Sequence, residues 1–100
     1  MLRIYFVALE MLKGLPLQII ERKDGDLARQ LRRAATSVVL NLAEGSGCSG
    51  GTRRQRYRDA LGSAREVQAC IDSSRALGYI TMSSVEGLRE ITGSLVKLTR

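Results

Sequence analysis

Apolar residues recur at helical spacing along almost the whole chain, and this pattern restricts the fold more than any other feature. Intervals of three and four residues place apolar side chains on one face of a helix. The four successive stripes are Ile4, Ala8, Met11, Leu12, Leu15 and Ile19; Leu27, Leu31, Ala34, Ala35, Val38 and Leu42; Tyr57, Leu61, Ala64, Val67, Ile71, Ser74 and Leu77; and Val85, Leu88, Ile91, Leu95 and Leu98. No stretch alternates with the period of two that a half-buried strand would show. The sequence predicts a single all-α domain over residues 1–100, an antiparallel up-down four-helix bundle with helices at about 3–22, 26–45, 52–77 and 83–99.

Local signals predict where these helices begin and end. The first stripe continues in phase past Pro16, which favours one kinked helix over a break just before the proline. Asp26 is the last residue of the turn sequence KDGD and is expected to cap the second helix, which closes at Gly45. Ser83 and Glu86 have the spacing of a capping box at the start of the last helix.

Composition and charge point to a polyanionic partner. Aromatic residues are only 4% of the 100 residues, so the core is expected to consist of aliphatic side chains, which suits helix packing. The net charge is +6, and most of the 16 basic residues are arginine, whose planar fork suits bidentate contact with phosphate. Nucleic acid is therefore the favoured partner and an anionic membrane surface the second, although a solvated basic surface is the simpler alternative.

The densest basic cluster surrounds Tyr57 at the start of the third predicted helix, where the sequence reads RRQRYR without an acid. A helix N-terminus favours anions, so cations placed there lower the stability of the helix unless a bound anion neutralises them. The second predicted helix adds further arginines toward its other end. The predicted nucleic-acid contacts are Arg32, Arg33, Arg53, Arg54, Arg56 and Arg58, with Tyr57 available to stack on a base.

Polar residues at helical spacing form a second pattern on the two middle helices. Ser37, Asn41 and Glu44 share one side of the second helix, and Ser63 and Glu66 share one side of the third. An interhelical hydrogen-bond network or a polar subunit seam is the favoured interpretation. The alternative is an enzyme that uses Glu44 and Glu66, through a bound metal.

The glycine-rich joint at residues 45–52 partly matches two catalytic motifs. It nearly spells a phosphate-binding loop, but Gly51 stands where the lysine must be and a helix precedes it instead of a strand. Ser49 is the centre of a G-x-S-x-G sequence, yet the chain contains no histidine to serve as its base or as a partner for Cys48. We therefore expect a non-enzymatic protein without cofactor or metal, and a joint longer than chain reversal requires.

The N-terminal apolar run ends at Glu10, which is too early for a signal peptide. Lys13 and Pro16 argue against a transmembrane span, so a cytoplasmic protein with no membrane partner is expected. Cys48 and Cys70 do not form a disulfide framework and are expected to be incidental thiols.

Two motifs in fixed order resemble a known family. Residues 27–47 resemble the signature of the bacterial four-helix bundle proteins encoded in intervening sequences of the large-subunit ribosomal RNA gene, a superfamily that includes the accessory variability protein of diversity-generating retroelements. The matching residues are Gln30, Leu31, Arg32, Arg33, Ala34, Ser37, Asn41, Ala43, Glu44 and Gly45. Residues 60–80 are similar to its second motif through Gly62, Ser63, Glu66, Leu77, Gly78 and Tyr79.

The resemblance implies an up-down four-helix bundle that assembles into a positively charged ring, typically a homopentamer. The accessory variability relatives bind nucleic acid and a partner reverse transcriptase, so structured RNA, an RNA–DNA intermediate and possible contact with a reverse transcriptase are the implied partners. The family provides no catalytic residue. Two departures stand out: the joint is richer in glycine and arginine than is usual, and Pro16 leaves the first helix end uncertain.

Overall fold

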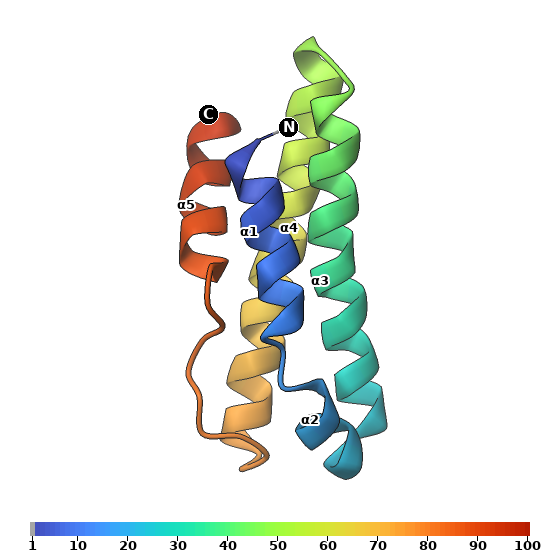
Figure 1. Ribbon diagram of the computed structural model, residues 1–100, viewed down its shortest axis with the longest axis vertical. Helices are drawn as coiled ribbons and strands as arrows, with labels where there is room; N and C mark the ends of the chain where they lie inside the picture. Colours follow the sequence, from blue (N-terminus) through green and yellow to red (C-terminus); the bar gives the residue numbers. More distant parts are fainter. Residues whose placement is uncertain (1) are drawn as a thin grey trace.

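The computed structural model describes residues 2–100 as five α-helices, with no strand in that range (Figure 1). The helices are α1 (Arg3–Lys13), α2 (Leu17–Lys23), α3 (Gly25–Ser46), α4 (Gly50–Ala76) and α5 (Leu88–Leu98). The molecule is compact and elongated, with extents of 42 × 19 × 19 Å. The prediction of an all-α chain is confirmed, whereas the prediction of four helices is corrected to five.

The two longest helices, α3 and α4, lie side by side and are joined by a short link at one end of the molecule (Figure 1). α1 packs against α3 and α5, and α5 packs against α4. α1 and α4 therefore lie diagonally across the molecule, with α3 and α5 on the other diagonal. This order of neighbours makes the side between α1 and α3 opposite to the side between α4 and α5.

The predicted stripes form most of the core. Met11, Leu31, Leu42, Ile71 and Leu95 are fully buried, and each contributes about 1.5–3 kcal/mol relative to an exposed side chain. Two residues at the ends of their predicted stripes, Leu77 and Leu98, are exposed. One follows the last residue of α4 and the other is the last residue of α5.

The chain breaks at Pro16, so the prediction of one kinked helix is wrong. α1 ends at Lys13 and α2 begins at Leu17, with Pro16 between them. Proline has no N–H to donate, and its ring would clash with the carbonyl group of Leu12 in a continuous helix. The break also shifts the apolar phase by one residue: Ile20 is fully buried, whereas the predicted Ile19 is 49% exposed.

Two helix starts differ from the predicted ones. Asp24, not Asp26, caps α3, because its Oδ1 atom accepts a hydrogen bond from the Leu27 N–H at 3.0 Å. Asp26 instead lies in the first turn of α3.

α5 does not begin with the predicted capping box. Its first residue is Leu88, it has no side-chain cap, and Gly87 precedes it with a φ of 88°. A residue with a Cβ would be strained there and would also approach the Val7 side chain to 2.7 Å. Ser83 and Glu86 therefore lie in the irregular segment 77–87, before the helix starts.

The link between α3 and α4 is shorter than the predicted joint. α3 continues through Gly45 to Ser46, and α4 begins at Gly50, so the link consists of Gly47, Cys48 and Ser49 alone. The Gly47 N–H donates to the carbonyl of Glu44 at 3.1 Å, and the Cys48 N–H donates to the carbonyl of Gly45 at 3.2 Å. These two bonds satisfy carbonyl groups at the end of α3, so the chain reverses tightly.

Candidate nucleic-acid interface

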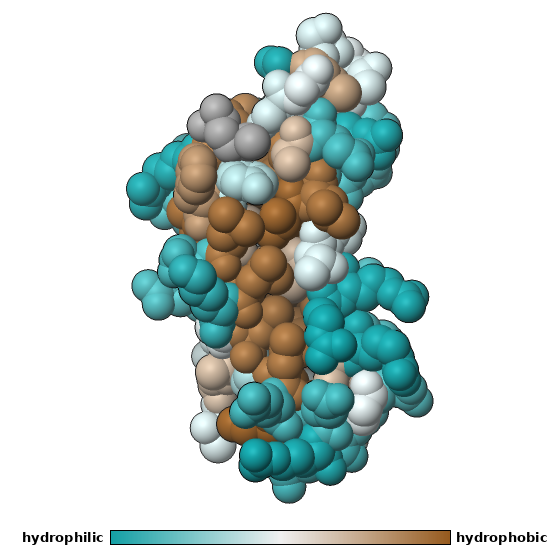
Figure 2. Space-filling model, turned by 45° about the vertical axis from the view of Figure 1, so that its right-hand side comes forward, coloured by the Kyte–Doolittle hydropathy of each residue, from teal (hydrophilic) through white to brown (hydrophobic). Residues whose placement is uncertain are grey.

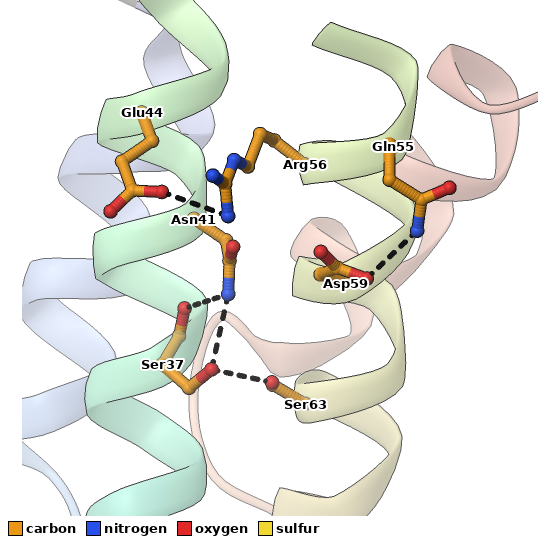
Figure 3. A network of polar contacts seen from close by, with 7 residues as sticks. All are labelled: Ser37, Asn41, Glu44, Gln55, Arg56, Asp59 and Ser63. Carbon is orange, nitrogen blue, oxygen red and sulfur yellow. Dashed lines mark hydrogen bonds and ion pairs between the residues drawn. The ribbon is translucent and has the colours of Figure 1, made fainter. Parts of the chain in front are cut away.

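The four arginines predicted as contacts at the start of α4 are all exposed, but they divide into two pairs. Arg53 and Arg56 make contacts with the end of α3. The Arg53 Nε atom donates to the carbonyl of Gly45 at 3.2 Å. The Arg56 guanidinium pairs with the Glu44 carboxylate at 3.1 Å (Figure 3). These two side chains therefore hold α4 against α3 as well as adding positive charge.

Arg54 and Arg58 form the second pair, one helical turn apart on α4. Neither has an ion-pair partner among residues 2–100, and the described first turn of α4 contains no acidic residue. These two arginines are consequently the cations of this cluster with the most to gain from an external anion.

Tyr57 does not belong to the exposed surface. Its side chain is only 4% exposed, and its ring packs directly on Gly45, where an added Cβ would lie 2.4 Å from Cε1. The prediction that Tyr57 could stack on a base is therefore wrong. Its place in the apolar stripe of α4 explains its burial.

Arg32 and Arg33 lie on α3, well away from the start of α4. They precede Gly45 by 12 to 13 residues, which places them roughly 18 Å along the helix. Both are exposed, and Arg32 approaches Glu21 of α2 at 3.9 Å, an exposed pair of little energetic weight. Within one chain the two arginine groups thus form separate patches.

A polar cluster joins α3 to α4 near the middle of the two helices (Figure 3). Ser63 Oγ donates to Ser37 Oγ at 2.8 Å. Asn41 Nδ2 donates to the Ser37 carbonyl at 3.0 Å and lies 3.1 Å from Ser37 Oγ. Ser37, Asn41 and Ser63 thus form one hydrogen-bonded group. Glu44 pairs separately with Arg56.

Glu66 lies outside this cluster. Its side chain is exposed and makes no hydrogen bond or ion pair within residues 2–100; it acts on Cys70, whose thiol pKa is raised by burial and, to a smaller extent, by this carboxylate. Glu44 pairs with Arg56, and Arg56 precedes Glu66 by ten residues on α4. The carboxylates of Glu44 and Glu66 are therefore separated by roughly 15 Å along the helix. This separation argues against a shared metal, and no group of three possible ligands lies together in the described part of the chain.

Sequence reasoning missed four further cations that the structure brings together. Arg65 of α4 lies beside Arg89, Lys97 and Arg100 of the α5 region, all lining one groove. Arg65 follows Arg54 and Arg58 by 11 and 7 residues, which places the three on one face of α4. That spacing was readable in the sequence, whereas the approach of α5 to this face was not.

The fold and the charge distribution define a class: a small, basic, all-helical protein with exposed arginines at a helix N-terminus. The chain belongs to the 23S rRNA-intervening sequence protein family, whose match covers residues 5–100. Comparisons with curated proteins and with solved structures find no match. The relation to the accessory variability protein of diversity-generating retroelements stays a prediction. No helix within residues 2–100 combines the length and the apolar character that a membrane span requires.

Proposed function

We propose that this protein is a non-enzymatic RNA-binding protein that holds structured RNA at the start of α4. The observation that carries the proposal is the exposed pair Arg54 and Arg58, which lies within the first three turns of α4 and lacks an ion-pair partner in residues 2–100. Membership of a family named for ribosomal RNA supports RNA as the polyanion. Arg53 and Arg56 add charge from the same turn, and Arg32 and Arg33 form a second contact patch.

Binding of this kind depends on phosphate neutralisation. Each arginine that contacts a phosphate releases condensed counterions, so the affinity falls as salt rises, with a slope that counts the contacts. Phosphate contacts position the RNA without reading its sequence. The proposed surface therefore binds many folded RNAs with similar affinity.

The test is the fluorescence anisotropy of a labelled RNA hairpin across a salt series. We expect the Arg54→Ala/Arg58→Ala double variant to bind more weakly and its salt slope to fall by about 2, one for each lost phosphate contact. The matched control is Arg22→Ala/Arg75→Ala, which removes the same charge from exposed positions elsewhere. Equal affinities and slopes for the two double variants would contradict the proposed site.

We also propose that α1, α3, α4 and α5 form an up-down four-helix bundle that assembles with further copies, as a ring of five in line with the resemblance. An apolar band on the side between α1 and α3 supports this proposal. Figure 2 shows this side, with hydrophobic surface along much of the length of the molecule and hydrophilic side chains at its borders. We define the apolar band as Leu9 and Leu12 of α1 with Val39, Leu40 and Ala43 of α3.

Neighbouring contacts support this grouping for the two residues of α1. Arg3 pairs with Glu90 of α5 and Val7 touches Gly87, so Leu9 and Leu12 lie on the other flank of α1, toward α3. Leu40 is the most exposed member of the apolar band, at 60%. A second copy that covers the band would remove this surface from water.

A second candidate function is that of an adaptor that binds a polymerase or reverse transcriptase without touching nucleic acid. Exposed apolar side chains on the outer helices favour it, namely Phe6 on α1 and Val96 and Leu98 on α5. In this case a Phe6→Ser/Leu98→Ser variant would lose the protein partner in gel filtration without nucleic acid present. In this case neither the unmodified protein nor the variant would bind the RNA hairpin.

A further inference from the structure

A groove of about 670 Å³ lies between α4, α5 and the segment that connects them. Four cations line it: Arg65 on α4, and Arg89, Lys97 and Arg100 from the α5 region. No acidic side chain is among the described residues of its lining. In a chain that carries 10 acidic residues, a groove with four cations and no acid has a strongly positive potential.

The floor of the groove is apolar and leaves space for a ligand. Ala64, Leu88 and Val96 line it, and Gly93 contributes no side chain at all. A Cβ added at Gly93 would meet no described atom within 4 Å, so this position opens directly into free volume. A volume of this size is in the range that accommodates a small organic ligand or one to two nucleotides.

One wall of the groove is held in place by hydrogen bonds. Gln68 Nε2 donates to the Ser83 carbonyl at 3.0 Å and to the Asp72 carboxylate at 2.8 Å. These bonds fix the connecting segment against α4 and engage the Asp72 carboxylate. The groove is therefore formed by the fold itself, before any ligand binds.

The groove lies on the same face of α4 as two arginines of the cluster at the start of that helix. Arg54, Arg58 and Arg65 share one face of that helix, within about 40° of one another. Ala64 and Arg100 both line the groove. Arg58 precedes Ala64 by six residues, so it lies about one to two helical turns from this part of the groove, toward the start of α4. A polyanion that leaves the groove at this end meets Arg58 and then Arg54.

We propose that this groove binds a single-stranded segment of the RNA, with phosphates on the four cations and a base against the apolar floor. The inference rests on the proposed RNA-binding function and extends it to a second, structurally separate contact. A positively charged groove that follows the phosphate backbone is one of the features by which proteins bind single strands without sequence preference. Because the groove contains no aromatic ring among its described lining residues, phosphate contacts dominate and binding is strongly salt-dependent.

The test places a negative charge in the free volume without disturbing the core. Gly93→Glu introduces a carboxylate that repels phosphate and fills the floor, at an exposed helical position with open space. The matched control is Gly25→Glu, the same substitution at another exposed, unobstructed glycine, on the first turn of α3. Arg89→Gln is a second variant that removes one cation and leaves the volume unchanged. Circular dichroism establishes that all three variants are folded.

The probes are a labelled oligouridylate of about eight nucleotides, which has no folded structure, and the RNA hairpin used above. We expect Gly93→Glu to weaken oligouridylate binding by about tenfold or more and Arg89→Gln by a smaller factor, with Gly25→Glu close to the unmodified protein. Equal oligouridylate affinity for Gly93→Glu and Gly25→Glu would overturn the proposal. If the hairpin binds and the oligouridylate does not, the groove assignment fails and the proposed function stands; if neither binds, both fail.

Discussion

Gly45 is the residue at which the end of α3, the start of α4 and the link between them meet. The Tyr57 ring lies on its Cα, and its carbonyl accepts hydrogen bonds from the Arg53 side chain and from the Cys48 N–H. A side chain at this position would occupy the space of the Tyr57 ring. The glycine of the Asn-x-Ala-Glu-Gly motif therefore has a packing role, and Glu44 beside it has an electrostatic one through Arg56.

We expect Gly45→Ala to destabilise the protein by about 1–3 kcal/mol, because the new methyl group forces the Tyr57 ring or the two helices apart. The measurement is the free energy of unfolding from urea denaturation. Gly62→Ala is the matched control: Gly62 is an exposed glycine inside α4 with open space, where alanine should stabilise by about 0.5–1 kcal/mol. Similar effects of the two substitutions would show that the contact with Tyr57 has no energetic weight.

Cys70 is expected to resist alkylation in the folded protein. Burial raises the pKa of its thiol above the ordinary value of 9.0, and Glu66 raises it further, so the reactive thiolate is disfavoured. At about pH 8, iodoacetamide should modify the half-buried Cys48 first and Cys70 only after unfolding, as mass spectrometry would record. Equal rates of modification in the native protein would contradict the burial of Cys70.

The pKa of the Cys70 thiol is higher in the folded protein than in the unfolded chain. The contribution of this thiol to stability is therefore complete below the unfolded pKa and is lost as the pH rises through the folded pKa.

At the residue scale the sequence predicted the core well and the surface less well. Tyr57 belongs both to an apolar stripe and to a cluster of arginines. The sequence alone does not show whether its side chain is buried with the stripe or exposed with the arginines. Packing decides it, because a ring that fits over Gly45 is buried whatever its neighbours in sequence are. Charges such as Arg65, which stand alone in the sequence, gain neighbours only when another helix approaches.

At the scale of helices, the sequence predicts that the helices exist, but it does not predict several of their boundaries. Three of the four predicted segments correspond to α3, α4 and α5, and the first is divided at Pro16. The apolar residues keep helical spacing across Pro16, which suggested one helix. A shift of the buried position by one residue does not visibly interrupt a pattern with a period of 3.6 residues. The start of α5 escaped prediction for a different reason: Gly87 is fixed by its contact with Val7, which is distant in sequence.

Asp24→Ala should destabilise α3 and the protein by about 1 kcal/mol, because the Leu27 N–H loses its acceptor. Asp24 also accepts a bond from the Tyr79 hydroxyl at 3.4 Å, which ties the end of α4 to the start of α3. Asp26→Ala serves as the control with the same charge change in the same turn, and a smaller effect is expected from it. Urea denaturation measures both, and a larger loss for Asp26→Ala would contradict the assignment of the cap.

At the scale of the whole molecule, two opposite sides have opposite character. The apolar band lies between α1 and α3, and the cationic groove lies between α4 and α5. A subunit that uses the first side to contact its neighbours keeps the second side free for RNA. The sequence contains both sets of residues, but their separation onto two sides follows from the order in which the helices pack.

Leu40→Glu should prevent assembly while leaving the subunit folded, because Leu40 is exposed in the single chain and the charge would be buried between copies. Light scattering after gel filtration measures the mass in solution. Leu77→Glu provides the control, since Leu77 is 58% exposed, close to the 60% of Leu40, and lies just beyond α4. An unchanged mass for Leu40→Glu would exclude the apolar band as the contact between subunits.

The short link between α3 and α4 has a consequence for the order in which the chain folds. The two longest helices meet after the closure of only three residues, so their contacts cost little loop entropy and have low sequence separation. We expect this helical hairpin to form early and the shorter α1 and α5 to dock onto it afterwards. Amide hydrogens near the centres of α3 and α4 should then exchange most slowly, and those of α2 should exchange fastest among the helices.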